Sequence, residues 1–268
     1  MVSFCYLSDE VVLGVLIHGA AMGAFLGLSL LWPRLTDQRL LRRDLVINVI
    51  TGGSIFLLAK PVTDLLSSQL QWSLWKLPIE SSILQFALAF LLLDFTRYWL
   101  HYAHHRVPFL WRFHTVHHSS ETLDVTSGLR MHVFDFLQLA MVPMLLFGVI
   151  LDIREWEEWV LPAALSVGVV FDAFQHANLR FDLSKPWNRA WHRVFNNPHF
   201  HVWHHTREGA EKDGNYGNSL VIWDRLFGTD VTESTIPPLL GVTAEKALVN
   251  DPFSLQLLRH QFVHSGKD

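Results

Sequence analysis

The chain has 268 residues, of which 50% are apolar and only 17% are charged. Soluble globular domains carry about a quarter of charged residues, so this composition favours a membrane protein. A net charge of -4 without an extended basic run argues against nucleic-acid binding, because neutralising phosphates requires clustered lysine and arginine. The single cysteine, Cys5, excludes an internal disulfide framework and any cysteine-rich zinc or iron–sulfur site.

Several apolar segments have about the length that a membrane-spanning helix needs, roughly 20 residues. In chain order they are residues 11–32, 45–66, 79–100, 133–151 and 159–175. The first has no formal charge, the second is interrupted by Lys60, Pro61 and Asp64, and the third is apolar as far as Asp94 and Arg97. The last two form a pair that crosses the membrane or dips into it. We therefore expect an all-α integral membrane protein with four to five membrane-spanning or re-entrant helices.

The orientation follows from the arginine-rich loop at 33–44, because basic residues in short loops stay on the cytoplasmic side. The N-terminus, which carries Asp9 and Glu10 and lacks the basic start of a signal peptide, is then expected outside. Counting spans forward places 101–132 and everything after His176 in the cytoplasm. All histidine clusters fall on this one side, although they were not used to orient the chain.

No repeat, low-complexity tract or separable second domain is visible, so we expect one domain over residues 1–268. Its expected parts are the first three spans (11–100), the first histidine motifs (101–132), a helical hairpin (133–176) and a histidine-rich cytoplasmic cap (177–268).

Histidine is the unusual residue in this composition, with 16 copies. One HxxxH motif and two HxxHH motifs account for half of them, and one further histidine ends the fifth apolar segment. Residues three and four apart share a helical face, so each motif can converge on one metal ion. The candidate ligands are His101, His105, His114, His117, His118, His176, His201, His204 and His205.

The number of ligands predicts two metal ions, because eight or nine neutral histidines exceed the four that one zinc ion needs. Imidazole suits iron, zinc, copper and nickel, so the ligand type alone leaves the metal open. Carboxylates commonly hold the other ring nitrogen of such ligands. Asp94 lies seven residues before His101, and Asp172 lies four residues before His176, so both are candidate orienting groups.

The remaining histidines have weaker motif context. His132 begins the fourth apolar segment on the correct side and is a candidate ligand or orienting group, and His104 and His199 are expected as orienting or surface residues. A packing role is expected for His18, which lies inside the first span. Solvent exposure is expected for His192, His260 and His264.

The order HxxxH, HxxHH and a distal HxxHH resembles the fatty acid hydroxylase / sterol desaturase superfamily. The run YWLHYAHHRVPFLWRFHTVHHS resembles the first two histidine boxes of that family, and DGNYGNSLVIWDRLFGT resembles the segment after its last box. The resemblance covers about Asp94 to Thr229. Tyr102 departs from it, since many members have arginine after the first histidine.

This resemblance implies a membrane-bound enzyme with two iron ions that uses O2 to hydroxylate or desaturate a C–H bond. The implied substrate is a fatty acyl chain, sterol, carotenoid or ether lipid. The implied electron donor is a separate reductase with a ferredoxin or cytochrome, and zinc can replace iron in purified protein. Two alternatives stay open at this point: a di-zinc membrane hydrolase, and a metal- or haem-binding membrane protein.

Overall fold

The computed structural model describes residues 7–36, 44–55, 57, 73–207, 213–231, 239–243 and 250–259. Its long helices are α1 (Leu7–Leu31), a helix over Asp44–Ile55, α3 (Ser82–Arg106), α5 (Val133–Leu145) continued by the π-helical turn η3 (Leu146–Ile150), and α6 (Val160–His176). Its short elements are α4 (Pro108–His118), the 3-10 turn η2 (Ser127–Leu129), α7 (Pro186–His192), α8 (Pro198–His204), α9 (Ile222–Phe227), α11 (Pro252–Gln256) and strands β1 (Trp75–Lys76) and β2 (Leu151–Asp152).

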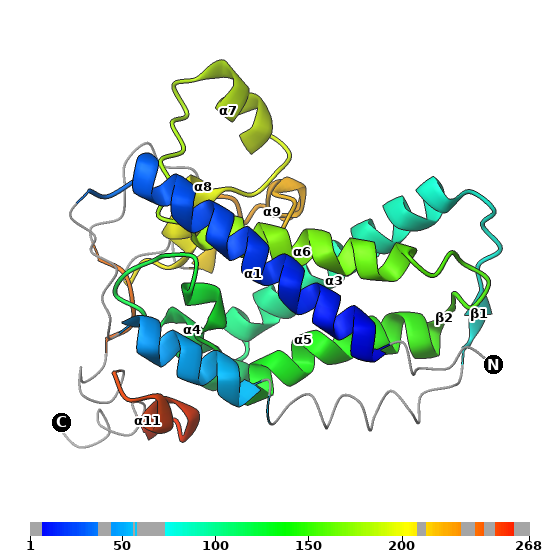
Figure 1. Ribbon diagram of the computed structural model, residues 1–268, viewed down its shortest axis with the longest axis horizontal. Helices are drawn as coiled ribbons and strands as arrows, with labels where there is room; N and C mark the ends of the chain where they lie inside the picture. Colours follow the sequence, from blue (N-terminus) through cyan, green and yellow to red (C-terminus); the bar gives the residue numbers. More distant parts are fainter. Residues whose placement is uncertain are drawn as a thin grey trace.

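The long helices form an elongated bundle in which α1 and α3 both pack against α6 (Figure 1). The apolar sequence explains this packing, because helices with few polar residues must bury their sides against one another or against lipid. One buried cluster joins α3, η3 and α6 near one end of the bundle. Its members are Ala89, Leu93, Phe147, Trp156, Val160 and Ala164.

Two helices among the described residues are long and apolar enough to cross a membrane, Ser82–Arg106 and Val133–Ile150. Three shorter apolar helices accompany them, over Leu16–Leu31, Asp44–Ile55 and Val160–His176. The mostly helical class is therefore confirmed, and the count of four to five spans stays a prediction. The second half of the expected span at 45–66 lies largely outside the described residues.

A pair of two-residue parallel strands, β1 and β2, closes the bundle end that carries the 152–158 turn (Figure 1). Nearby, Trp156 Nε1 donates to the carbonyl of Leu77 at 2.9 Å, and the amide of Glu157 donates to Gln85 Oε1 at 3.0 Å. The all-α prediction omitted these strands, since a two-residue strand is too short to show alternation.

At the opposite end, α3 continues six residues beyond the predicted limit of residue 100 and carries the HxxxH motif on its last two turns. It ends before Val107, because the residue preceding a proline disfavours helical backbone, and Pro108 then starts α4 at its first turn. This tight connection folds α4 back, so that the two histidine motifs lie against each other. Asn197 starts α8 in the same region, and its side chain accepts the amides of His199 and Phe200 at 3.1 Å.

Candidate metal centre

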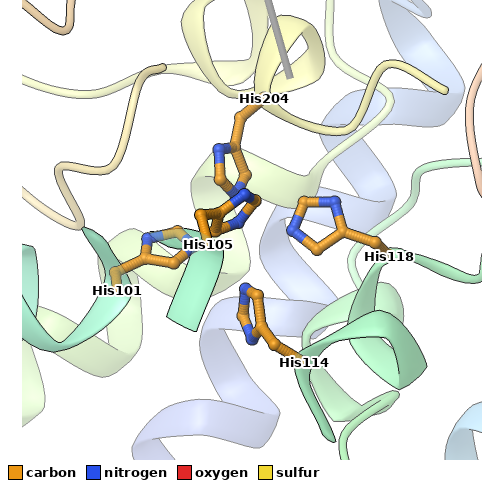
Figure 2. A group of neighbouring side chains, drawn as sticks. All are labelled: His101, His105, His114, His118 and His204. Atoms are coloured by element: carbon orange, nitrogen blue, oxygen red, sulfur yellow. The ribbon is translucent and has the colours of Figure 1, made fainter. Parts of the chain in front are cut away.

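Five histidines from three helices form the first group of candidate ligands (Figure 2). We call His101, His105, His114, His118 and His204 the five-histidine group; one ring nitrogen of each lies within 4.8 Å of those of the others. The rings come from α3, α4 and α8 and converge on a common space. All five Nε2 atoms are buried and have no hydrogen-bond partner.

The opposite ring nitrogens explain why these Nε2 atoms carry lone pairs. His101 Nδ1 lies 2.8 Å from the carbonyl of Tyr216, and His204 Nδ1 lies 2.8 Å from the carbonyl of Gly214. A carbonyl only accepts hydrogen bonds, so Nδ1 must carry the proton and Nε2 the lone pair. Converging lone pairs without donors repel one another, and a bound cation removes that repulsion.

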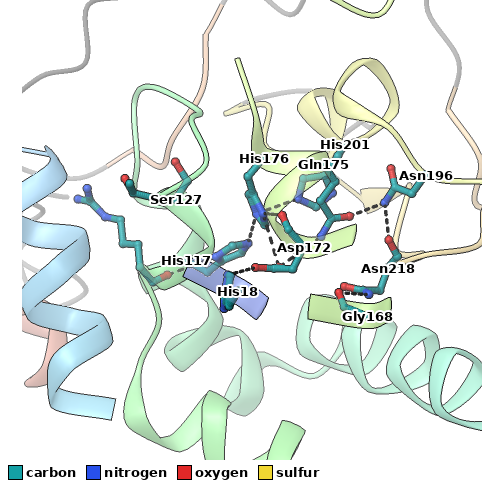
Figure 3. Close-up of polar contacts among 12 residues, drawn as sticks. His18, His117, Ser127, Gly168, Asp172, Gln175, His176, Asn196, His201 and Asn218 are labelled. Carbon is teal, nitrogen blue, oxygen red and sulfur yellow. Dashed lines mark hydrogen bonds and ion pairs between the residues drawn. The ribbon is translucent and has the colours of Figure 1, made fainter. Parts of the chain in front are cut away.

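Four further histidines form the second group, and we call His117, His176, His201 and His205 the four-histidine group. Figure 3 shows His117, His176 and His201 facing one another. Successive Nε2 atoms lie 3.3 Å apart for His117 and His176, 3.1 Å for His176 and His201, and 3.0 Å for His201 and His205. These contacts join α4, α6 and α8.

The partners of the Nδ1 atoms show that the four-histidine group also suits a metal ion. His117 Nδ1 lies 3.2 Å from the carbonyl of Arg130, and His176 Nδ1 lies 2.7 Å from the carbonyl of Asp172. Both Nδ1 atoms therefore donate, and the two Nε2 lone pairs face each other at 3.3 Å. A direct hydrogen bond between them is impossible in these tautomers, whereas a divalent cation between them is favourable.

The two groups are adjacent, because both HxxHH motifs contribute neighbouring residues to different groups. His117 and His118 divide between them, as do His204 and His205, and the rings of His118 and His205 stack at 4.4 Å. The described residues thus supply nine imidazoles in two neighbouring groups, each of which could hold a metal ion, and imidazole suits borderline cations such as iron and zinc.

Burial favours the neutral form of an imidazole, which is the form that a metal ligand must have. Burial, reinforced by neighbouring histidines, lowers the pKa of His117 from its ordinary value of 6.5 to about 3. The same causes hold the pKa values of His118, His201 and His205 well below 6.5. At neutral pH these four rings therefore present lone pairs and no positive charge.

The structure places the two predicted orienting carboxylates differently. Asp172 lies beside the four-histidine group, with Oδ1 3.5 Å from His176 Nδ1 (Figure 3). Asp94 instead accepts the backbone amides of Ser219 and Leu220 at 2.9 and 3.1 Å and the indole of Trp223 at 2.9 Å. Its carboxylate ties α3 to the segment before α9, and the expected contact with His101 is absent among the described residues.

The other histidines are also placed. His104 is buried and so is not a surface residue; its Nε2 lies 3.8 Å from Asp135 Oδ1, and its orienting role stays a prediction. His132 caps α5: its Nδ1 accepts the amide of Phe134 at 3.0 Å, and its Nε2 donates to the carbonyl of Gln256 at 2.9 Å. Both ring nitrogens are used, so His132 is not arranged as a ligand.

The predictions for two more histidines have different outcomes. His18 is partly buried in α1, as expected, and its Nε2 lies 3.9 Å from Asp172 Oδ2. His192 was expected in solvent, and this prediction is wrong: the ring is buried and lies 3.0 Å from the Asn197 side-chain amide. The candidates His260 and His264 lie outside the described residues.

Asp135 is the principal residue that the sequence reasoning missed. This buried carboxylate accepts a hydrogen bond from His114 Nδ1 at 2.9 Å and also faces His104. It is the one acidic residue of the mainly apolar helix α5, and such a residue marks a functional site by default. That signal was present in the sequence, but the partner histidines are on other helices.

The loop before α9 belongs to the segment that resembles the family in sequence, and the structure shows its physical role. Asp224 accepts the amides of Tyr216 and Gly217 at 2.7 and 2.8 Å, and Asn215, with a left-handed φ of 59°, donates from its side chain to the carbonyl of Phe200 at 2.8 Å. These bonds fix the loop whose carbonyls at Gly214 and Tyr216 hold His204 and His101. The segment therefore holds two rings of the five-histidine group in position.

Fold and site together define a helix-bundle protein with two buried polyhistidine groups suited to a pair of metal ions. A family model described as fatty acid hydroxylase matches residues 86–229, more than half of the chain, and the protein belongs to this family. The matched range contains all nine candidate ligands, that is, the whole of both groups.

Curated relatives agree with this assignment. Ornithine lipid hydroxylase of Rhizobium tropici is 32% identical over 148 residues, which cover 54% of this chain and 41% of that protein. Alkylglycerol monooxygenase of Xenopus tropicalis is 32% identical over 170 residues, covering 63% and 35%, and its human counterpart is 27% identical over 201 residues, covering 72% and 42%. The chain therefore spans less than half of the length of each of these oxidoreductases. No solved structure gives a significant match.

Proposed function

We propose that this chain is a membrane-bound di-iron oxygenase that hydroxylates a C–H bond of a lipid. The observation that carries this proposal is the convergence of Nε2 atoms in two adjacent groups: they have no hydrogen-bond partner in the five-histidine group and face one another at 3.0–3.3 Å in the four-histidine group. The proposed ligands are His101, His105, His114, His118 and His204 for one iron ion, and His117, His176, His201 and His205 for the other.

The chemistry of the substrate supports the choice of reaction. A saturated C–H bond offers no acidic proton, so acid–base side chains cannot activate it, and a metal centre with O2 supplies the oxidising power. The overall reaction converts R–H, O2, two electrons and two protons into R–OH and water. The electrons come from a separate donor, a reductase with a ferredoxin or cytochrome, and the matched relatives act on ornithine lipid and alkylglycerol.

The protein's own residues hold and shield this centre. Carbonyls of Tyr216, Gly214 and Arg130 orient three of the rings, Asp135 orients His114, and burial excludes water from the reacting space. In this proposal the apolar helices α3, α5 and α6 lie in the bilayer, and a lipid chain would approach the histidines along them.

The proposed topology has four to five spanning or re-entrant helices, with the N-terminus outside and the histidines in the cytoplasm. Residues 11–100 hold the first three spans, 101–132 the first motifs, 133–176 a hairpin and 177–268 the cytoplasmic cap, all in one domain. Reporter fusions after residue 40 and at the C-terminus should both report the cytoplasm. A cytoplasmic signal near residue 155 would make the hairpin re-entrant and leave the histidine side unchanged.

The direct test supplies reductant and isotopically labelled O2 to the purified enzyme with a membrane lipid extract. Label in the product supports hydroxylation, and a product that lacks two hydrogens and carries no label indicates desaturation. Turnover that persists without O2 would overturn both and indicate a di-zinc hydrolase. The His117→Ala variant should be inactive, whereas His199→Ala, in the same region but outside both groups, should retain activity.

A further inference from the structure

The segment from residue 180 to 194, which contains α7, projects away from the helix bundle (Figure 1). It exposes large apolar side chains: Trp187 is 67% exposed, Trp191 40% and Val194 39%. Exposed tryptophan of this extent on a projecting segment is costly in water, because the indole buries a large apolar area when it finds an apolar surface. The segment therefore exposes apolar area, most of all at Trp187.

The charge of the same segment is strongly basic. Arg180, Lys185, Arg189 and Arg193 are all exposed, and Asp182 is the single acid. The carboxylate of Asp182 is engaged locally, since it accepts the amide of Ser184 at 2.9 Å. Tryptophan together with lysine and arginine is the composition of segments that lie in the headgroup layer of a membrane.

The segment leaves the bundle where an apolar helix ends. Trp32 follows the last residue of α1 and is 59% exposed, and its carbonyl accepts the amide of Arg180 at 2.9 Å. An isolated antiparallel bridge between Pro33 and Leu179 fixes the same junction. In the proposed topology α1 lies in the hydrocarbon, so its Trp32 end marks the membrane boundary, and the segment starts at that level.

The segment is also coupled to the candidate metal centre. Trp191 packs on Phe171 of α6, with ring centroids 6.1 Å apart and nearly parallel planes at 23°. It also contacts Phe174, with centroids 6.1 Å apart. The last turn of α6 carries His176, so the depth of the segment in a membrane determines the depth of the four-histidine group.

We propose that residues 180–194 lie in the headgroup layer of a membrane that contains anionic lipids, with Trp187 directed toward the hydrocarbon. The proposal rests on the membrane placement in the proposed function and extends it. The basic side chains select anionic headgroups, because such residues near a membrane surface are attracted to its negative potential. The segment would thereby hold the metal centre at the level where a lipid headgroup meets its chains.

Site-directed spin labelling in lipid nanodiscs tests this directly. The label replaces Trp187 (Trp187→Cys) in a chain whose single cysteine is removed by Cys5→Ser, and Val194→Cys provides a second reporter. Glu155→Cys is the control, because the side chain of Glu155 is 76% exposed at the far end of the bundle. We expect collisions with O2 to exceed those with a polar nickel chelate at 187 and 194, and the reverse at 155. Water-like values at both 187 and 194 would overturn the proposal.

The lipid charge is tested by comparing nanodiscs of phosphatidylcholine alone with nanodiscs containing phosphatidylglycerol. The label at 187 should be more shielded from the nickel chelate in the anionic discs, by about twofold or more. Lys185→Gln with Arg193→Gln should abolish that difference, and Lys76→Gln at the far end should not. Equal shielding in both lipids would overturn the anionic preference. Lipid oxidation by an enzyme with a water-exposed label would refute this inference alone, whereas an inert enzyme with a buried label would refute only the proposed function.

Discussion

The Asp135→Asn variant should weaken metal binding by the five-histidine group without removing a ligand. Asp135 accepts a hydrogen bond from His114 Nδ1 at 2.9 Å, and the carboxylate is fully buried. An asparagine oxygen can still accept this hydrogen bond, but it lacks the negative charge that the carboxylate carries beside a bound cation. That charge makes the imidazole a stronger donor to the metal. The variant therefore isolates the charge of the carboxylate from its shape.

The magnitude follows from the difference between the two hydrogen bonds. Bonds to charged groups contribute about 1.5–3 kcal/mol and neutral ones about 0.5–1.5 kcal/mol, so the loss is roughly 1–1.5 kcal/mol. This corresponds to about a tenfold weaker metal affinity, within the 10- to 100-fold range typical of such orienting partners.

The assay is chelator competition on purified protein, with metal content measured at each chelator concentration. Asp213→Asn is the matched control, because Asp213 Oδ1 lies 3.9 Å from His105 Nδ1, beyond hydrogen-bond range, and its side chain is 37% exposed. We expect the control to change affinity by less than about threefold, since solvent screens exposed pairs. Unchanged binding in Asp135→Asn, or equal losses in both variants, would refute the reasoning.

Two further predictions concern the close packing and the titration of the histidines. Gly128→Ala should lower the metal content of the four-histidine group and the activity, because an added Cβ would collide with the Asp172 carboxylate and lie 3.3 Å from His176 Nδ1. The control Gly53→Ala should retain both, because its added Cβ meets no atom within 4 Å. Equal effects of the two substitutions would contradict the packing argument. Metal-free protein should lose stability as the pH falls below about 6.5. Burial lowers the folded-state pKa to about 3 for His117 and about 4 for His192, so the unfolded chain binds more protons there. A melting temperature that is equal or higher at pH 5.5 than at pH 7.5 would contradict this sign.

The candidate ligands were accessible from the sequence because metal binding imposes a local spacing. HxxxH and HxxHH place imidazoles on one helical face whatever the tertiary structure, and the structure brings all nine predicted histidines into two groups. The division into five and four was not predictable, since adjacent residues such as His117 and His118 point to different groups.

The orienting residues were less predictable because their partners come from other elements. Asp94 shares a helical face with His101, but it turns toward the backbone of Ser219 and Leu220, which the sequence could not place. Asp135 holds a histidine 21 residues earlier in the chain. His192 has no motif around it, yet its burial follows from the way the chain packs before α8.

The metal content of the protein tests the central claim most directly. Protein purified without O2 should contain about two equivalents of iron and zinc together, and His204→Ala and His201→Ala should each reduce this to about one, because they remove a ligand from different groups. One equivalent in the wild type, or two in either variant, would contradict a paired metal centre built from these histidines.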